Sequence, residues 1–313
     1  MNVFLSICIP AYKRPENIDR LLSSIDIQTL KNFEIIITDD SADDSLINVL
    51  EKYKHLPIGY YRNQKPLGTP ANWNYCISLA KGEWIKIMHD DDWFVDEHSL
   101  STFVEATSKG KRFIVSRYFN VFSSGKKELP AFRPGSKAKI LHVPMLLLAK
   151  NVIGPPSVTL VHHTIKEQYD TFMKWRVDID FYIRILSNEK EFELIDKPLV
   201  NVGISESQVT NNCIDNPDVE LPEGLLLLHK YGSSPLKNII VYDAWWRIIR
   251  NVNIRKRDQL KEFTSYKTWP EIILRMVDHQ ARLPQSLLKF GPFSKITMAL
   301  SYLANSKKLK EGN

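Results

Sequence analysis

The sequence lacks the features that define several classes of protein. Its 313 residues include only three cysteines, Cys8, Cys76 and Cys213, without disulfide or zinc-ligand spacing, so we expect them to be buried and reduced. No apolar stretch approaches the ~18 to 20 residues of a membrane-spanning helix. The first residues lack the basic start and the cleavage site of a signal peptide. These absences predict a globular protein of the cytoplasm.

Charged residues are plentiful but unevenly distributed. The chain has 42 Lys and Arg against 36 Asp and Glu, a net charge of +6. From Lys230 to Asn313, 16 basic residues stand against 6 acidic ones, a local +10, whereas residues 1–229 carry 26 against 30. No nucleic-acid-binding motif accompanies the basic region, so we expect no nucleic acid partner. The region is either a surface for anionic lipids, which attract each cation by about 1 kcal/mol, or a helical cap whose cations are solvated.

Three adjacent carboxylates, Asp90, Asp91 and Asp92, follow the apolar run 84–88. Burying unpaired carboxylates is costly, so we expect a cation beside them. The run predicts a buried strand, and open α/β sheets bind their ligands at the carboxyl ends of strands. Oxygen ligands of this kind suit Mg2+ or Mn2+ bridging to a phosphate.

Short apolar runs alternate with helical patterns over the first part of the chain. Pro15, a favourable first-turn residue, precedes apolar side chains at i, i+3, i+4 and i+7, which predicts an amphipathic helix. Such a strand–helix–strand series predicts an α/β fold with a mainly parallel sheet covered on both faces. The predicted strands are 4–9, 35–37, 59–61, 84–88, 113–116, 158–161 and 199–202.

The pattern becomes helical from about Asn212 onward. We therefore divide the chain into an α/β domain over 1–211 and a basic helical region over 212–313. Two apolar stripes at helical spacing occur in this region, and we expect both to face a core, as amphipathic helices usually do. One stripe is Trp245, Ile248, Ile249 and Val252, and the other is Phe293, Ile296, Leu300 and Leu303.

Five short motifs lie in a common register within the first hundred residues. They are 6–14 (SICIPAYKR), 38–41 (TDDS), 67–74 (LGTPANWN), 80–85 (AKGEWI) and 89–93 (HDDDW). In order and spacing they resemble the family 2 inverting glycosyltransferases. The resemblance covers roughly residues 3–210. It implies a Rossmann-like GT-A fold, a nucleotide-sugar donor, with UDP-sugar favoured, and a divalent metal ion.

The resemblance implies a nucleotide site after the first two strands. Asp40 matches the family's aspartate that contacts the base of the nucleotide. A carboxylate at this place can accept hydrogen bonds from a base N–H and from a ribose hydroxyl. Residues 10–12 match contacts to a uracil ring, or else form a turn with a packed tyrosine. Arg14 is either a nucleotide contact or a solvated cation at a helix start. The nucleotide-binding candidates are Pro10, Ala11, Tyr12, Arg14, Asp39, Asp40, Gly68, Asn72 and Asp90.

The acid triplet departs from the family's pattern of an acid, a spacer and two acids. Asp91 falls at the metal-binding acid and is the metal ligand that we expect for Mg2+ or Mn2+. Asp90 stands at the spacer, as a candidate for ribose or metal, and Asp92 is a support for a neighbouring loop. His89 occupies the place of the first acid. It is either part of the site or an ordinary strand-end histidine.

Inverting transfer needs a base on the acceptor side and charge neutralisation at the leaving diphosphate. Residues 175–184 resemble the family's acidic pair before an aromatic helix, which places Asp178 at the catalytic base. Asp180 lies two residues on, and positions i and i+2 do not share a helix face, so only one acid points at the sugar. We favour Asp178. Both acids could instead complement a helix dipole.

Residues 203–210 resemble a segment that often carries a histidine ligand to the metal or the diphosphate. Ser205 stands in its place. Metal affinity is then weaker, or Gln208 or Glu206 contacts the phosphates instead. The candidate acceptor or phosphate contacts are His89, Asp92, Asp180, Ser205 and Gln208.

Two other functions fit part of the pattern. A sugar-phosphate nucleotidyltransferase shares the fold and the acids, but residues 10–14 lack the glycines of its phosphate loop. A non-catalytic nucleotide-sugar-binding protein would keep Asp40 without needing Asp178.

The membrane spans and the Gln-x-x-Arg-Trp segment of processive synthases are both missing. We therefore expect a non-processive hexosyl- or N-acetylhexosaminyl-transferase. Its acceptor would be a glycan or a lipid-linked oligosaccharide. Peripheral association with the inner face of the cell membrane fits the basic C-terminal region.

Overall fold

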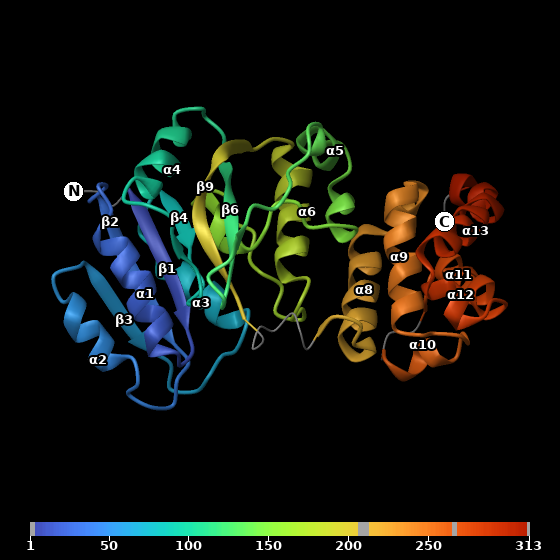
Figure 1. The fold of residues 1–313 in the computed structure, drawn as a ribbon, viewed down its shortest axis with the longest axis horizontal. Coiled ribbons are helices and arrows are strands. Elements are labelled where there is room, and N and C mark those ends of the chain that lie inside the picture. Colours follow the sequence, from blue (N-terminus) through green and yellow to red (C-terminus); the bar gives the residue numbers. More distant parts are fainter. Residues whose placement is uncertain (1–3, 206–212, 265–267, 312–313) are drawn as a thin grey trace. The chain divides into compact units, whose positions relative to one another are not determined.

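The computed structural model describes residues 4–205, 213–264 and 268–311, and a nine-stranded sheet forms the core of its first two hundred residues (Figure 1). Its strand order is β3-β2-β1-β4-β8-β6-β9-β5, with β7 paired to β6. The strands are β1 (Leu5–Ala11), β2 (Phe33–Asp39), β3 (Ile58–Arg62), β4 (Trp84–Ile87), β5 (Trp93–Phe94), β6 (Phe113–Phe122), β7 (Lys127–Glu128), β8 (Thr159–His162) and β9 (Glu193–Ile204).

The first four strands are parallel, as the alternating pattern predicted. β1 pairs in parallel with both β2 and β4, and β2 with β3. All seven residues of β1 are buried, because helices cover both faces of the sheet. Antiparallel pairs appear only beyond β4 among the described strands, at β4–β8, β6–β8, β6–β7 and β5–β9. The α/β fold class is confirmed, and the second half of the sheet is mixed.

Amphipathic helices cover this sheet. The helix α1 begins at Pro15 and buries the predicted stripe of Ile18, Leu21, Leu22 and Ile25. The helices of the first two hundred residues are α1 (Pro15–Asp26), α2 (Ile47–Leu50), α3 (Ala71–Ser78), α4 (Ser99–Thr107), α5 (Ser136–His142) and α6 (Val177–Glu189). The three cysteines are buried free thiols, as predicted.

The C-terminal region is helical, as predicted. Its helices are α8 (Pro217–Tyr231), α9 (Ile239–Asn251), α10 (Gln259–Glu262), α11 (Glu271–Ala281), α12 (Gln285–Lys289) and α13 (Gly291–Glu311). No helix among the described residues combines the length and the apolar character needed to cross a membrane.

One of the two predicted core stripes is wrong. Trp245, Ile248 and Ile249 of α9 are buried, whereas Ile296, Leu300 and Leu303 of α13 are exposed. The polar residues of α13 face its neighbours instead, which the apolar spacing alone could not reveal.

The chain forms two compact units that interleave in sequence. The first comprises residues 1–141, 152–171 and 180–206, and the second comprises 142–151, 172–179 and 207–313. The second unit therefore includes two short segments that precede the helical region. The domain boundary expected at residue 211 stays a prediction.

Candidate functional site

The ends of β1 and β2 bring the nucleotide-binding candidates to one edge of the sheet. Ala11 lies opposite Asp39 in the parallel register, and the Asp40 amide donates to the Ala11 carbonyl at 2.9 Å. Asp39 is fully buried and accepts hydrogen bonds of 2.8 Å from the Ser41 amide and from the Tyr60 hydroxyl. Asp39 therefore ties the end of β2 to β3.

Asp40 organises the loop that carries the LGTP motif. Its carboxylate accepts hydrogen bonds from Asn63 Nδ2 at 2.7 Å, the Leu67 amide at 3.0 Å and the Gly68 amide at 2.8 Å. Gly68 has a φ of +72°, which favours glycine at this turn. An ionised carboxylate offers about four acceptor sites, so Asp40 keeps capacity for one further donor such as a base N–H.

Asn72, another nucleotide-binding candidate, has internal partners. Its Nδ2 donates to the Thr38 carbonyl at 3.0 Å, and its Oδ1 accepts from Asn63 Nδ2 at 3.0 Å. The side chain is buried. Asn72 therefore joins the end of β2 to the loop that Asp40 holds. It stabilises this edge of the sheet through internal hydrogen bonds.

The segment after β1 presents exposed and charged groups. Tyr12 is 53% exposed, while Ala11 is buried. Arg14 has a left-handed backbone, and its Nη1 lies 3.7 Å from Asp90 Oδ1. Burial and the neighbouring Asp91 raise the pKa of Asp90 to about 7, while Arg14 opposes the rise. The Arg14–Asp90 pair links the nucleotide edge to the acid triplet.

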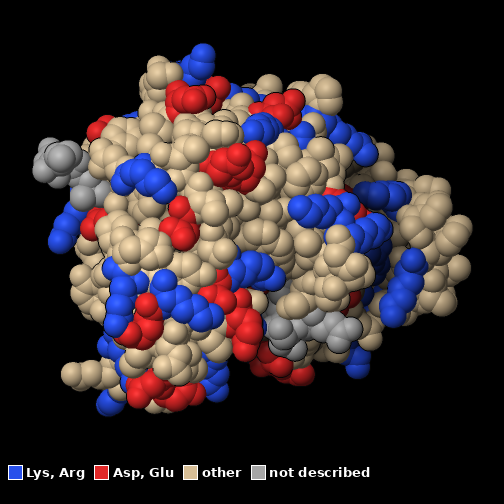
Figure 2. Space-filling model, turned by 60° about the vertical axis from the view of Figure 1, so that its left-hand side comes forward, with Lys and Arg blue, Asp and Glu red and all other residues tan. Residues whose placement is uncertain are grey.

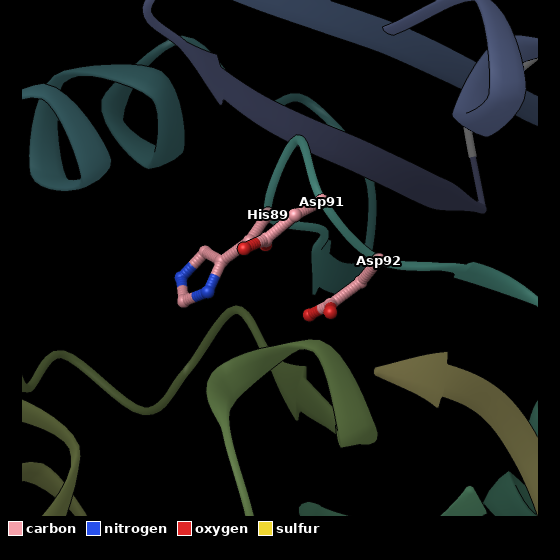
Figure 3. A group of neighbouring side chains, drawn as sticks. All are labelled: His89, Asp91 and Asp92. Atoms are coloured by element: carbon pink, nitrogen blue, oxygen red, sulfur yellow. The ribbon is translucent and has the colours of Figure 1, made fainter. Parts of the chain in front are cut away.

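Three potential metal ligands, His89, Asp91 and Asp92, leave one loop between β4 and β5 and project to the same side (Figure 3). One ligand atom from each lies within 4.8 Å of the others. His89 Nε2 is buried and has no hydrogen-bond partner among the residues that the structure describes. Burial lowers the pKa of His89 to about 4, so its imidazole is neutral and can offer a lone pair. One imidazole and two carboxylates form a donor set that fits a divalent cation.

A network from other strands holds the loop in place. The Ser157 hydroxyl accepts from the His89 amide at 2.9 Å, and the Gly203 amide donates to Asp92 Oδ1 at 3.2 Å. Lys86, fully buried in β4, donates to the Ser157 carbonyl. Burial lowers the pKa of Lys86 to about 7, and the nearby Asp92 opposes that change.

Arg20 of α1 braces the loop from the outside. Its Nη2 donates to the Asp91 carbonyl at 3.0 Å, and its guanidinium lies 3.9 Å from the centroid of the Trp93 ring. Sequence reasoning missed both Lys86 and Arg20. A lysine inside an otherwise apolar strand was a readable signal for Lys86, whereas Arg20 resembles any solvated helix residue.

An aromatic wall lies beside His89. The Trp73 ring of α3 lies 4.5 Å from the His89 ring and meets Tyr169 edge-on at 5.1 Å. Asn74 fixes Tyr169 in place, because it donates to the Tyr169 carbonyl at 2.7 Å and accepts from the Tyr169 amide at 2.9 Å. These contacts hold the imidazole in one orientation.

Asp178 lies in the second unit, in the first turn of α6. Its Oδ2 accepts from Asn151 Nδ2 at 2.8 Å, and its Oδ1 accepts from the Ile179 amide at 2.8 Å. Burial raises the pKa of Asp178 to about 7, which is a suitable value for a general base near neutral pH. Asp180, by contrast, is fully buried and forms an ion pair of 2.9 Å with Arg184.

The backbone that precedes α6 is anchored to α8. Glu223 accepts hydrogen bonds from the amides of residues 174, 175 and 176 at 2.6, 3.0 and 2.7 Å. Glu220 pairs with the Arg176 guanidinium at 2.5 Å. All three side chains are buried. The helix α8 thus positions residues 174–176, directly before α6 begins.

The last candidates lie beyond β9. Ser205 is exposed directly after β9 ends. Glu206 and Gln208 lie outside the described residues.

Comparison with known proteins identifies the fold and the family. Residues 6–155 match the model for glycosyl transferase family 2. Over these residues the chain is similar to the family 2 glycosyltransferases. The expected family and enzyme class are therefore confirmed.

Curated relatives of this glycosyltransferase agree with that assignment. The amylovoran biosynthesis glycosyltransferase AmsB of Erwinia amylovora is 28% identical over 277 residues, which cover 85% of this chain and 83% of AmsB. An uncharacterized glycosyltransferase of Haemophilus influenzae is 36% identical over 93 residues, 30% of this chain, so the chain spans only 31% of that relative. WfaP of Escherichia coli, a UDP-Glc:alpha-D-GlcNAc-diphosphoundecaprenol beta-1,3-glucosyltransferase, is 35% identical over 91 residues, 29% of this chain and 36% of WfaP.

Solved structures share the GT-A fold of this glycosyltransferase. Staphylococcus aureus TarS 1–349 in complex with UDP-GlcNAc superposes with a TM-score of 0.57 at 13% identity, covering 98% of this chain and 92% of that one. The mannosyltransferase PcManGT of Pyrobaculum calidifontis, in complex with GDP-Man and Mn2+, has a TM-score of 0.54 at 13% identity, covering 96% and 86%. At this identity the likeness concerns the fold alone.

Proposed function

We propose that the protein transfers one sugar, with inversion, from a UDP-sugar to a hydroxyl group of a glycan or lipid-linked acceptor. The observation that carries this proposal is the convergence of His89, Asp91 and Asp92 at the sheet edge that also holds Asp40. Carboxylates gathered there would repel a diphosphate unless a cation lay between them. Mg2+ or Mn2+ held by these residues would neutralise charge that develops on the leaving diphosphate.

Side chains of the protein carry out the remaining steps of the proposed reaction. Asp40 accepts a hydrogen bond from the base, and Arg14 with Asp90 borders the ribose and the phosphates. Asp178 takes the proton of the acceptor hydroxyl while that oxygen bonds to the anomeric carbon. The bond from this carbon to the diphosphate oxygen breaks on the opposite face, and the nucleoside diphosphate leaves with the bonding electrons. Asp180, held by Arg184, keeps the helix turn in place.

Donor and acceptor classes come from chemistry that relatives share. TarS binds UDP-GlcNAc, and WfaP acts on a diphosphoundecaprenol-linked sugar. A UDP-sugar donor and a lipid-linked acceptor are therefore the first choices for this protein. The local charge of +10 over residues 230–313 favours an anionic membrane surface as the place where such an acceptor is met.

A panel of nucleotide sugars with Mn2+, scored by release of nucleoside diphosphate, tests the proposal. Asp178→Asn should lower kcat by about 10^2- to 10^4-fold, which is the usual contribution of a general base, while UDP binding stays intact. Full turnover by Asp178→Asn would move the base elsewhere. Nucleotide-sugar binding without turnover by the wild type would instead favour the non-catalytic alternative.

A further inference from the structure

The helix α13 turns its polar face toward the other helices of its unit. Ser294, Ser301 and Asn305 are each less than 5% exposed. Ser301 Oγ lies 2.7 Å from both the Tyr242 hydroxyl of α9 and His279 Nδ1 of α11. This face is therefore held by directed hydrogen bonds rather than by apolar packing alone.

Further hydrogen bonds at both ends fix the rotation of α13. Ser294 Oγ accepts from Trp246 Nε1 at 3.2 Å and from Arg250 Nη1 at 3.0 Å. Asn305 donates to the Tyr242 hydroxyl at 2.8 Å and accepts from Arg275 Nη1 at 3.0 Å. Turning the helix would leave these buried polar groups unpaired, which is costly. These hydrogen bonds thus fix which side of α13 faces outward.

The outward face of α13 is apolar. Ile296, Leu300 and Leu303 are 62%, 61% and 64% exposed, and their spacing of i, i+4 and i+7 places them on one side of the helix. Phe290, directly before the helix, is 62% exposed. Single exposed apolar residues are ordinary, but a row of them on one helix face marks a surface that binds a partner.

The stretch of sequence that carries this face has a surplus of positive charge. Residues 279–310 contain six Lys and Arg and no Asp or Glu. Of these, Arg282 and Lys289 are exposed, whereas Lys295 pairs with Asp243 at 2.6 Å. On the left-hand part of the face drawn in Figure 2, acidic and basic groups lie side by side, the mixed pattern usual for a solvated surface. Residues 279–310 lack that mixture of signs in their own sequence, and their surplus of cations complements an anionic surface.

We propose that α13 lies in the interface of an anionic membrane, with Ile296, Leu300 and Leu303 inserted among the lipids. An interfacial helix of this kind combines an apolar face with flanking cations and lies parallel to the membrane. The inference rests on the proposed function in one respect, since a lipid-linked acceptor gives the docking its purpose. Binding to lipid itself requires neither donor nor catalysis.

Vesicle sedimentation tests the docking face directly. The full chain is mixed with vesicles of phosphatidylcholine alone or with phosphatidylglycerol added, at low and high salt. We expect binding to the phosphatidylglycerol vesicles that weakens with salt, because exposed charges are screened. The triple variant Ile296→Ser, Leu300→Ser and Leu303→Ser should bind about 10-fold or more weakly, because it removes three inserting side chains.

A matched variant controls for general loss of surface apolarity. Ile27, Ile47 and Leu129 are exposed apolar residues of the first unit. Their combined replacement by serine should leave vesicle binding unchanged. Both triple variants change exposed side chains, so their melting temperatures should match that of the wild type and exclude unfolding as the cause.

Three results would overturn the proposal. If the α13 triple variant bound vesicles as tightly as the wild type does, charge alone would account for the attraction. Equal loss of binding in the control variant would remove the specificity of this face. A wild type that ignores both vesicles but dimerises through α13 would make a second copy the partner. Asp178→Asn should bind vesicles like the wild type, so failure of the docking face and failure of the proposed chemistry remain distinguishable.

Discussion

Asn151 Nδ2 donates a hydrogen bond of 2.8 Å to Oδ2 of Asp178. The bond favours the ionised carboxylate, whereas burial and the negative charge of Glu223 favour the protonated form. The balance raises the pKa of Asp178 to about 7. A base with this pKa should give an activity that falls as the pH drops below about 7, because the carboxylate is then protonated.

The fall in activity at low pH is the acid limb of the pH profile. Asn151→Ala should move this acid limb to higher pH. The substitution removes a donor to the ionised form, so the pKa of Asp178 rises and the base stays protonated over a wider range. The pH profile of kcat for the wild type and the variant measures the shift. An acid limb at the same pH in both would show that another group titrates. UDP affinity serves as the control and should not change.

Glu223→Gln should move the acid limb the opposite way. Glutamine keeps the shape but removes the charge that raises the pKa of Asp178, so the base ionises at lower pH. Its side-chain oxygen can still accept from the amides of residues 174 and 175, so the fold should persist. An acid limb unchanged, or moved to higher pH, would contradict the electrostatic role of Glu223.

Glu223→Ala should chiefly affect stability. It leaves three backbone amides without their acceptor, and each buried unsatisfied group costs about 1 to 3 kcal/mol. Denaturant unfolding should show a loss of at least about 2 kcal/mol. Exposed Glu191→Ala is a suitable comparison, because surface ion pairs such as Lys111–Glu191 contribute about 0 to 1 kcal/mol. Equal effects of the two substitutions would refute the anchoring role.

Gly203→Ala should weaken metal binding. A Cβ at this position would lie 2.4 Å from the Asp91 carbonyl oxygen, and backbone cannot yield without moving the loop that carries Asp91. Titration with Mn2+ in the presence of UDP measures the effect. Gly291→Ala, where a Cβ meets no atom within 4 Å, should bind Mn2+ like the wild type. Tight Mn2+ binding by Gly203→Ala would show that the loop tolerates displacement.

The sequence was most informative where local pattern determines structure. Apolar runs followed by acids located the ends of β2 and β4, because strand ends in a parallel sheet share one edge. Asp178 was instead chosen from the resemblance of residues 175–184 to the family's acidic pair, and its role as the base stays a prediction. Contacts between distant segments were not readable in this way. Glu223 meets residues 174–176 across 47 to 49 positions, and Arg20 meets Asp91 across 71.

The stripe of α13 shows a second limit. Apolar residues at helical spacing predict a helix face that is removed from water. The spacing is the same whether that face packs into the protein's core or binds a partner. The decision depends on Ser294, Ser301 and Asn305, whose hydrogen-bond partners come from α9 and α11. Only tertiary structure supplies those partners.

Thermal shift with UDP, with and without Mn2+, tests the proposed site most directly. Ligand at ~100 times its Kd should stabilise the wild type by about 2.7 kcal/mol. We predict a shift that requires Mn2+ and that Asp91→Ala abolishes, while Asp178→Asn retains it. If neither UDP nor any other nucleoside diphosphate shifts the wild type in the presence of Mn2+, the metal and nucleotide site described above is wrong.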